Sequence, residues 1–171
     1  MEPKQASFKN DPKFNMGRTG EKTVAEILQR RGWYIIPSYD YSGEDGDKAP
    51  KLHGAFNSYV IPDLDASKEG CRIWVEVKTK TAATYTRITK RLEHGIPYRH
   101  FRSYKEVEQI TGCPVYLAVY EMETGEVLAG RLAELAKNAR YSDSAVMGKM
   151  IFFPRDVFKV VARLDEKVAG S

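Results

Sequence analysis

The chain has 171 residues, of which 42% are hydrophobic, and its 27 Lys and Arg residues against 23 Asp and Glu residues give a net charge of +4. This length and apolar content suit one compact domain and leave too little for two. The charge fits a nucleic-acid partner but also many unrelated proteins, and the two separated cysteines, Cys71 and Cys113, indicate neither a disulfide framework nor a zinc finger. No segment resembles a signal peptide or a transmembrane helix, so we expect a cytoplasmic protein without a membrane partner.

The chain begins with a polar segment, residues 1–15, which we expect to be a flexible arm ahead of a single domain over residues 16–171. Apolar residues then recur at helical spacing over residues 19–31, and Gly32 follows where a left-handed cap would end that helix. Residues 33–37 are predicted to form a short strand.

Two extended runs follow a segment rich in glycine and charge, residues 38–58, which we expect to be a long loop. The runs cover residues 58–65 and 71–80, and the intervening residues 67–70 have the composition of a hairpin turn. An antiparallel pair is therefore expected. Residues 81–97 are polar and basic and show no firm period.

The rest of the chain alternates between helices and strands. We expect helices over residues 98–110, 132–140 and 157–164, and strands over residues 115–120, 127–131 and 150–153. This order predicts an α/β fold with a central mixed β-sheet flanked by helices.

The run over residues 71–80 carries a charged pair on one face. Strand alternation places Glu76 and Lys78 on the same side, beside Trp74. By itself such a pair is typical of a half-exposed strand whose charges lie in water. A second feature is needed before the pair indicates chemistry.

Asp63 supplies that feature, because it lies one short hairpin from Glu76, after a proline, Pro62, that suggests a strand bending at its edge. Hydrolysis of a phosphodiester at neutral pH needs a nucleophile made from water and stabilisation of extra negative charge, and a hard divalent cation supplies both. Two carboxylates hold such a cation, and a lysine orients the water or neutralises charge. Asp65, expected on the same face as Asp63, is an alternative or additional ligand.

These residues resemble the PD-(D/E)XK nuclease superfamily, with Pro62-Asp63 as its first motif and Glu76-Val77-Lys78 as its second. The match extends to the sequence Gly17-Arg18-Thr19-Gly20-Glu21, which is similar to a helix start in the Holliday-junction-resolvase-like and phage-associated branches. The resemblance covers residues 17–120.

The resemblance implies a restriction-endonuclease-like core and a DNA endonuclease that uses Mg²⁺, for which Mn²⁺ can substitute. It implies that Asp63, Glu76 and the carbonyl of Val77 are metal ligands. Lys78 would act on the water or the charge, and Glu21 would be an auxiliary ligand.

Glu21 also has a purely structural explanation, since the helix dipole favours an acidic residue in a first turn whatever its function. A capping box does not account for it, because Lys22 rather than Glu or Gln stands three residues after Thr19. Its spacing to Val24 and Leu28 places it at the head of the buried stripe, facing the sheet, which favours a role in the site.

A basic stretch with interleaved aromatic residues follows the second motif. Cations contact phosphates and rings stack on bases, so this stretch is the expected DNA-binding surface. The expected contacts are Lys80, Arg87, Lys90, Arg91, Arg99, Arg102 and Lys105, and the rings are Tyr85, Tyr98, Phe101 and Tyr104. The alternative is a solvated helix face with its rings packed in the core.

The three histidines, His53, His94 and His100, show no metal-binding spacing, and we assign them no catalytic role. The sequence also lacks a phosphate-binding loop and the elbow of a serine hydrolase, which argues against both chemistries.

Several functions remain open within this fold. The absence of a separate specificity domain favours recognition of branched DNA over a sequence-specific restriction-like enzyme, and an exonuclease is a further alternative. A catalytically inactive nucleic-acid-binding protein would usually lack a site residue, whereas all of them are present here. A homodimer and a bacterial or phage-infected host cell are both compatible with the sequence.

Overall fold

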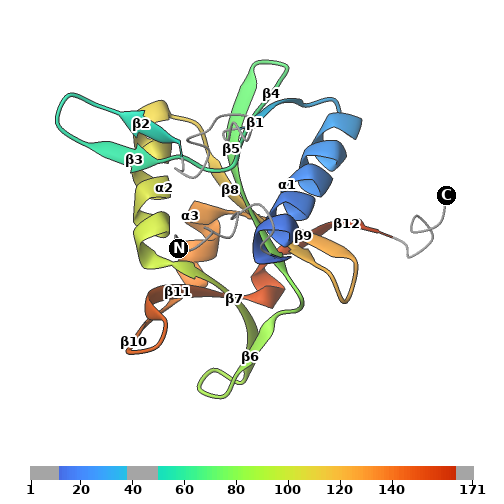
Figure 1. Ribbon diagram of the computed structural model, residues 1–171, viewed down its shortest axis with the longest axis vertical. Coiled ribbons are helices and arrows are strands. Elements are labelled where there is room, and N and C mark those ends of the chain that lie inside the picture. Colours follow the sequence, from blue (N-terminus) through green and yellow to red (C-terminus); the bar gives the residue numbers. More distant parts are fainter. Residues whose placement is uncertain (1–11, 38–49, 165–171) are drawn as a thin grey trace, which may run out of the picture.

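The computed structural model describes residues 12–37 and 50–164. Six strands form a central sheet in the order β1-β4-β5-β8-β9-β12 (Figure 1). Their bounds are Tyr34–Pro37, Leu64–Lys68, Cys71–Lys80, Val115–Glu121, Glu126–Arg131 and Lys159–Arg163. Neighbouring strands run antiparallel except β5 and β8, which are parallel. The expected central mixed sheet is confirmed.

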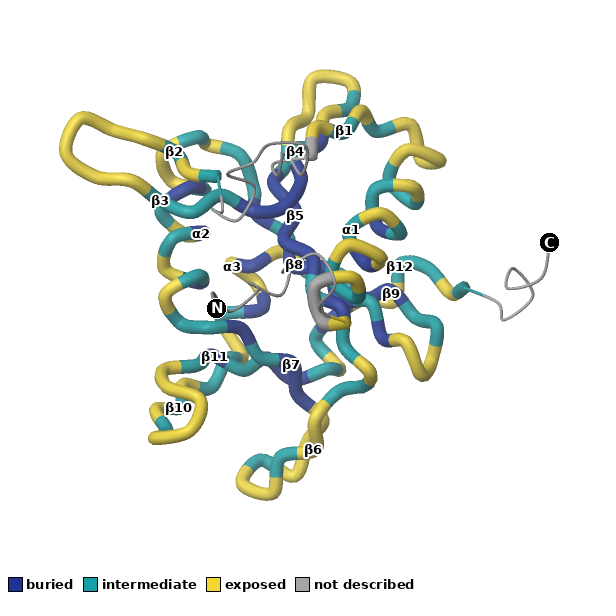
Figure 2. The backbone as a smooth tube through the Cα atoms, in the orientation of Figure 1, coloured by how far each residue is buried: buried dark blue, intermediate teal, exposed yellow. Residues whose placement is uncertain are grey.

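The two long helices cover opposite faces of this sheet, so that β5 and β8 are largely buried on both sides (Figure 2). The helix α1, Pro12–Arg30, packs Val24 in one apolar cluster with Val75 and Val77. The helix α2, Tyr98–Thr111, packs its buried side chains in a second cluster with Trp74. Odd and even positions of β5 therefore face different helices.

Two smaller sheets lie beside the central one. The first has the strand order β10-β11-β7-β6, with bounds Arg140–Ser144, Gly148–Pro154, Arg91–Pro97 and Thr84–Thr86. The second is a hairpin of β2, Lys51–His53, and β3, Ser58–Val60. The remaining short elements are the helix α3, Leu132–Leu135, and two 3₁₀ turns, Ala136–Asn138 and Arg155–Val157.

The end of α1 follows the sequence closely. Gly32 has φ of 83°, its N–H donates to the Gln29 carbonyl, and the Trp33 N–H donates to the Leu28 carbonyl at 3.1 Å. This pair of bonds is a Schellman cap, which confirms the expected ending. The helix begins at Pro12, earlier than expected, since proline suits a first helical position. Residues 12–15 of the expected arm belong to it, and residues 1–11 lie outside the described residues.

Other expectations are also confirmed. The strands β4 and β5 pair antiparallel around Glu69 and Gly70, both with positive φ. The helix α2 ends at Gly112 in the left-handed conformation, and β8 and β9 pair as expected. None of the helices in the described part of the chain has both the length and the apolar surface to cross a lipid bilayer.

Three expectations about elements are wrong. The stretch 157–164 forms the strand β12 instead of a helix, because its valines complete the sheet edge by pairing with β9. The last part of the expected loop 38–58 forms the β2–β3 hairpin, with residues 38–49 outside the described residues. The stretch 81–97, which shows no firm period and for which no element was expected, contains β6 and β7. The helix expected over 132–140 ends early, since Arg140 already pairs with Phe152 of β11.

Candidate active site

The two carboxylates of the motifs lie next to each other at the open end of the β4–β5 hairpin. Asp63 immediately precedes β4, whose Leu64 pairs with Val75 of β5, so that Asp63 falls beside Glu76. The Val77 N–H donates to Asp63 Oδ2 at 2.8 Å. Only 7% of Asp63 and 2% of Glu76 is exposed, which excludes the half-exposed strand that the sequence also allowed.

Burial and two neighbouring carboxylates, Glu76 and Glu21, raise the pKa of Asp63. Burial contributes most, followed by Glu76, with Glu21 also contributing, and together they hold the pKa of Asp63 well above its ordinary value. Lys78 and the Val77 N–H act in the opposite direction but do not outweigh them. An ionised Asp63 is therefore strained electrostatically unless a further positive charge is present.

Lys78 and Glu76 form an ion pair on the α2 side of β5. One Glu76 oxygen, Oε1, is the acceptor of this pair. The other, Oε2, is buried and has no hydrogen-bond partner among the described residues. A buried carboxylate oxygen without a donor is uncommon, and it marks a position where a cation would be stabilised.

Glu21 reaches the site because α1 approaches β5 very closely at the preceding residue. Gly20 is buried, and a Cβ there would lie 1.8 Å from Oγ1 of Thr79. No side chain larger than hydrogen fits at this crossing. The neighbouring Glu21 then lies near enough to Asp63 to raise its pKa. The close packing of α1 on β5 therefore explains the second glycine of the Gly-x-x-Gly-Glu sequence.

These residues fit a hard divalent cation. The described residues contain no group of three or more His, Cys, Asp and Glu side chains placed to hold a metal. Mg²⁺ keeps several waters and binds proteins through one or two carboxylates, a demand that Asp63 and Glu76 meet. The carbonyl of Val77 faces the same side of β5 as its N–H, which points at Asp63.

Comparison with solved structures finds chains of similar fold. The structure of Hjc, a Holliday junction resolvase from the archaeal hyperthermophile Archaeoglobus fulgidus, matches with a TM-score of 0.55 over 85% of this chain and 97% of that chain, at 14% sequence identity. The chain therefore shares the fold of this resolvase. A nuclease from a fusellovirus, D212, matches with a TM-score of 0.47 over 93% of this chain and 90% of that chain, at 9% identity. No family model matches the sequence, and no curated protein matches it.

Asp65 is not available as the alternative ligand that the sequence allowed. Its two oxygens accept hydrogen bonds from the Arg72 guanidinium, at 2.9 and 2.6 Å. Asp65 lies within β4, opposite Trp74, whereas Asp63 precedes that strand and bonds to β5. The ion pair with Arg72, and not the face of the strand, therefore separates Asp65 from the site.

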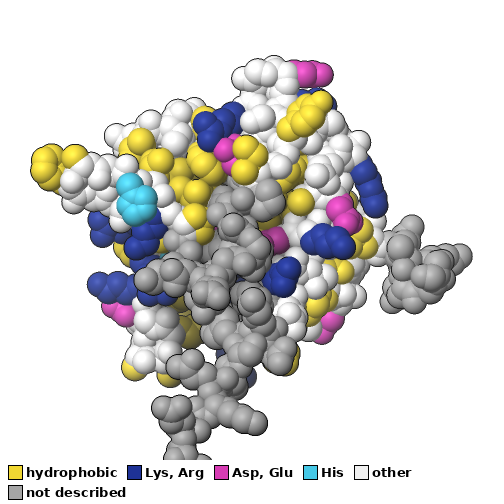
Figure 3. Space-filling view, turned by 45° about the horizontal axis from the view of Figure 1, so that its top comes forward, with side chains coloured by type: hydrophobic (Ala, Val, Ile, Leu, Met, Phe, Trp, Pro, Cys, Tyr) yellow, Lys and Arg dark blue, Asp and Glu magenta, His cyan; other side chains and the backbone are white. Residues whose placement is uncertain are grey.

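The expected DNA-binding residues divide into three places. Lys80 lies on β5 near Lys78, and burial together with Lys78 lowers the pKa of Lys80. The second group, Arg87, Lys90 and Arg91, lies on the β6–β7 hairpin, and the third, Arg99, Arg102 and Lys105, is exposed on α2. Figure 3 shows Lys and Arg side chains gathered at the left of the view, the side on which α2 lies.

The aromatic residues of this stretch are mostly core residues. Phe101 and Tyr104 are 3% and 2% exposed and belong to the apolar cluster under α2, and Tyr98 packs against that cluster. They cannot stack on bases, so that part of the interpretation is wrong. Tyr85, on β6, is 59% exposed and is the one of the four rings accessible to a ligand.

His100 is a residue of the site that the sequence did not identify. It lies in the first turn of α2, where the charges of Glu76 and Lys78 both act on it, and burial is the main cause of its lowered pKa. Its Nδ1 is buried without a hydrogen-bond partner among the described residues. No sequence spacing signals this contact, because it depends on how α2 docks on β5.

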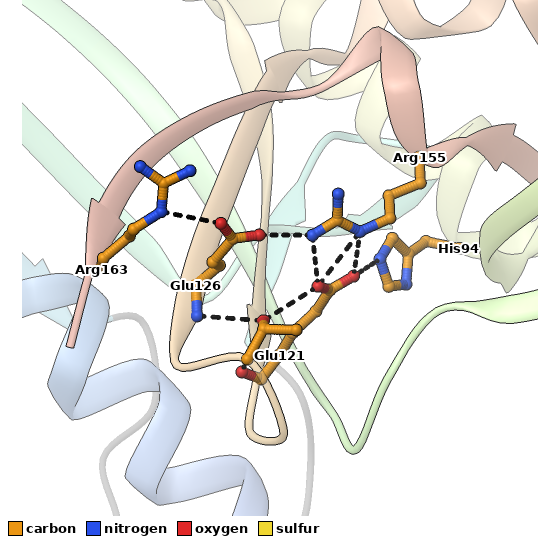
Figure 4. Close-up of polar contacts among 6 residues, drawn as sticks. His94, Glu121, Glu126, Arg155 and Arg163 are labelled. Atoms are coloured by element: carbon orange, nitrogen blue, oxygen red, sulfur yellow. Dashed lines mark hydrogen bonds and ion pairs between the residues drawn. The ribbon is translucent and has the colours of Figure 1, made fainter. Parts of the chain in front are cut away.

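A second group of buried charges lies where β8 ends (Figure 4). Glu121 accepts from His94 Nε2 at 2.7 Å and from Arg155 Nη2 at 2.7 Å. Arg155 also bonds to Glu126, which accepts from Arg163 Nε at 2.9 Å. This network joins β7 and the 3₁₀ turn before β12 to the central sheet. It gives His94 a structural partner.

Proposed function

We propose that this protein is a Mg²⁺-dependent endonuclease that hydrolyses phosphodiester bonds of DNA, with Mn²⁺ as a substitute metal. The observation that carries the proposal is the buried pair Asp63 and Glu76, which has an unpartnered oxygen and Lys78 beside it. Structural residues are not usually left in that condition, because an unsatisfied buried charge lowers stability. A functional site retains it when a ligand completes it.

Each residue has a distinct role in this proposal. Asp63, Glu76 and the Val77 carbonyl would hold the metal, which lowers the pKa of a bound water and stabilises charge on the phosphate. Lys78, tied to Glu76, would orient the attacking water or neutralise the charge that develops on the phosphate. Glu21 would accept a proton or a hydrogen bond from water at the α1 side of Asp63.

The cations beyond the motifs would bind the DNA backbone. Lys80 lies nearest to the site, and the hairpin and helix groups extend the positive surface through Arg87, Lys90, Arg91, Arg99, Arg102 and Lys105. Phosphate contacts of this kind position DNA without reading its sequence. This supports structure-specific recognition of branched DNA in a bacterial or phage-infected cell, with a homodimer as one arrangement that would present two sites.

The deciding experiment incubates the protein with supercoiled, linear, single-stranded and four-way-junction DNA, with Mg²⁺, Mn²⁺ or a chelator. Cleavage is expected with either metal and none with chelator, and the junction is expected to be cleaved fastest. Undiminished cleavage in excess chelator would exclude the metal mechanism. No cleavage of any substrate would favour the inactive DNA-binding protein.

Substitution of Lys78 separates these outcomes further. Lys78→Ala is expected to reduce cleavage by at least about a hundredfold while DNA affinity is kept. Glu76→Ala should also weaken Mg²⁺ binding measured by calorimetry, whereas in Lys78→Ala that binding persists or strengthens. Lys159→Ala, an exposed lysine on the edge strand β12, is the matched control and should leave cleavage unchanged. Full activity of Lys78→Ala would refute the assignment of the motif.

The DNA surface has its own test. Arg99→Ala combined with Arg102→Ala should flatten the dependence of DNA affinity on salt concentration, because a protein that makes fewer phosphate contacts releases fewer counterions when it binds. A Lys137→Ala plus Lys159→Ala variant removes the same charge outside the expected surface and should leave the slope unchanged. Equal slopes for all three proteins would place the binding surface elsewhere.

A further inference from the structure

The turn between β6 and β7 projects from the body of the molecule (Figure 1) and has an unusual tip. It consists of Arg87, Ile88, Thr89 and Lys90, since Thr86 pairs with Arg91 in the last register position of the hairpin. Ile88 is 84% exposed, and the cations on either side, Arg87 and Lys90, are also exposed. A large apolar side chain thus stands in water between two positive charges.

Hydrogen bonds to the buried carboxylate of Glu93 hold this tip in place. The buried carboxylate of Glu93 accepts hydrogen bonds from Thr86 Oγ1 at 2.8 Å and from Thr89 Oγ1 at 2.9 Å. Arg140, from the neighbouring hairpin, donates to the same carboxylate at 2.7 Å. Glu93 therefore clamps the turn at both ends. A turn fixed in this way loses little conformational freedom when it binds a ligand.

The other hairpin tips lack this combination. The β10–β11 tip exposes Val146 and Met147, but the charged residues nearest to it, Asp143 and Lys149, have opposite signs. The β2–β3 tip exposes Phe56 and has no cation within the turn itself. An exposed apolar residue alone needs no explanation. Two flanking cations and a buried clamp distinguish Ile88.

We propose that the β6–β7 tip is a DNA wedge, in which Ile88 inserts at a base step while Arg87 and Lys90 contact the phosphates on either side. Apolar side chains inserted between base pairs unstack them and kink the duplex, and cations next to the wedge hold the backbone. Unstacking is easiest where stacking is already broken, so the preferred ligand is a branch point. The proposal takes DNA as the partner from the proposed function and adds the feature of DNA that this part of the protein recognises.

The hairpin is placed to act together with the candidate active site. It follows β5 directly, so Lys78 and Lys80 precede it in the same stretch of chain. Lys78 and Lys80 lie near the carboxylates and Arg87 and Lys90 at the tip, so cations stand at both ends of this stretch, and Asp156 pairs with Arg91 beside the hairpin. DNA held at the tip would contact both groups of cations as it runs toward Asp63 and Glu76.

The test uses the full chain in chelator, so that binding is measured without cleavage. A four-way junction carries the fluorescent base 2-aminopurine at its branch, and a linear duplex carries it in the same sequence. Protein binding should raise the fluorescence on the junction, because an unstacked 2-aminopurine is brighter. Anisotropy gives the affinity for both DNAs.

Ile88→Ala should remove most of the fluorescence rise and weaken junction binding by about tenfold, with less than about a twofold change on the linear duplex. Ile88→Leu should retain both signals. Val146→Ala, at the tip of the other hairpin, is the matched control and should behave as wild type. Thr89→Val, which removes one bond of the clamp and leaves the tip charges, should weaken junction binding by an intermediate amount.

Equal fluorescence and affinity for wild type and Ile88→Ala would overturn the wedge, and would instead favour a protein partner for this tip. So would equal losses in Ile88→Ala and Val146→Ala, or equal losses on both DNAs. If Ile88 controls the fluorescence while no metal supports cleavage, the proposed nuclease function fails and the wedge stands. If cleavage is normal and Ile88→Ala changes neither the fluorescence nor the affinity, the wedge proposal is refuted and the proposed nuclease function stands.

Discussion

The buried carboxylates near Asp63 and those near Glu121 differ in what surrounds them. Burial raises the pKa of both groups, but at Glu121 the bonds from Arg155 and His94 outweigh burial, and the pKa is lowered. At Asp63 the nearest strong influences after burial are other carboxylates, and the pKa is raised. An ionised buried carboxylate therefore stabilises the fold at Glu121 and destabilises it at Asp63. This difference separates a structural network from a site prepared for a ligand.

Replacement of Asp63 by Asn should have the largest effect on activity. Under the proposed function Asp63 is a metal ligand, and its loss would remove several kcal/mol of transition-state stabilisation, so cleavage should fall by about a thousandfold. The amide oxygen still accepts from Val77 N–H and carries no buried charge, so the melting temperature should rise by about 2–4 °C for each kcal/mol gained. Calorimetry and a junction-cleavage assay measure the two effects.

Asp65→Asn is the control for that experiment, because Asp65 forms an ion pair with the half-exposed Arg72. It should keep cleavage, and its melting temperature should change little. A lower melting temperature for Asp63→Asn than for wild type would show that Asp63 is structural and would break the comparison.

Glu121→Gln should have the largest effect on stability. The substitution leaves Arg155 and His94 without their shared charged acceptor, and breaking a buried pair costs about 3–5 kcal/mol. Cleavage per folded molecule should stay near wild type at low temperature, where the variant is folded. Chemical denaturation with urea measures the loss.

The matched control is Glu134→Gln, which removes an exposed pair with Lys137. Because both side chains are exposed to water, its effect on the unfolding free energy should be much smaller than that of Glu121→Gln. If both glutamine variants lose equally little, the network of Figure 4 contributes nothing beyond a surface pair.

Gly20→Ala should have an intermediate effect on both properties. The new methyl group would overlap Thr79 Oγ1, so α1 must shift, at a cost of about 1–3 kcal/mol. The shift moves Glu21 and should reduce cleavage. Gly17→Ala is the control, since a Cβ there contacts nothing within 4 Å, and it should stabilise α1 slightly.

A second change tests the cause. Thr79→Ala removes the overlapping hydroxyl and should restore part of the stability and activity of Gly20→Ala. If the double variant is as impaired as the sum of the two single variants, the contact between these residues is not the reason for the glycine.

Lowering the pH should reduce the stability contributed by the network around Glu121 and reduce the destabilisation caused by Asp63. The pKa of His94 is lowered, mainly by burial, so its contribution to stability is lost as pH falls below its ordinary value of 6.5. Glu121 and Glu93 have lowered pKa values, and their contributions are lost below 4.5. Asp63 has the opposite sign, because protonation is easier in the folded state. Each group contributes at most about 1.4 kcal/mol per pH unit.

Urea denaturation across this pH range should therefore show stability falling with acid in the wild type. Glu121→Gln should flatten the fall. Asp63→Asn should steepen it, because it removes the one group of the set that gains stability in acid. Parallel pH profiles for all three proteins would mean that these carboxylates do not differ in the way the structure indicates.

Much of the fold was predictable from local signals. Gly32 and Gly112 end helices in the left-handed conformation, and the β4–β5 and β8–β9 hairpins follow from alternation and turn residues. The strand β12 was not predictable, since the apolar spacing of its valines also suits a helix and only pairing with β9 decides between them. The strands β6 and β7 were also not predictable, because their polar and basic residues show no firm period.

The site divides in the same way. Asp63 and Glu76 are separated by one hairpin, so their proximity follows from the sequence. The contacts of Asp65 with Arg72 and of His100 with the site depend on strand boundaries and helix docking, and neither leaves a local signal. The burial of Phe101 was hidden because a basic and aromatic stretch suits DNA and a packed helix equally well.

The single parallel pair in the central sheet, β5 with β8, also determines the order in which the molecule forms. The β4–β5 and β8–β9 hairpins join neighbouring segments, and such hairpins form in about 1–10 microseconds, whereas the parallel pair joins strands that are separated by β6, β7 and α2 and is expected to form later. Asp63 and Glu76 belong to one of the early hairpins. Their mutual repulsion therefore opposes folding from its first step, and a divalent cation present during refolding should speed the formation of that hairpin.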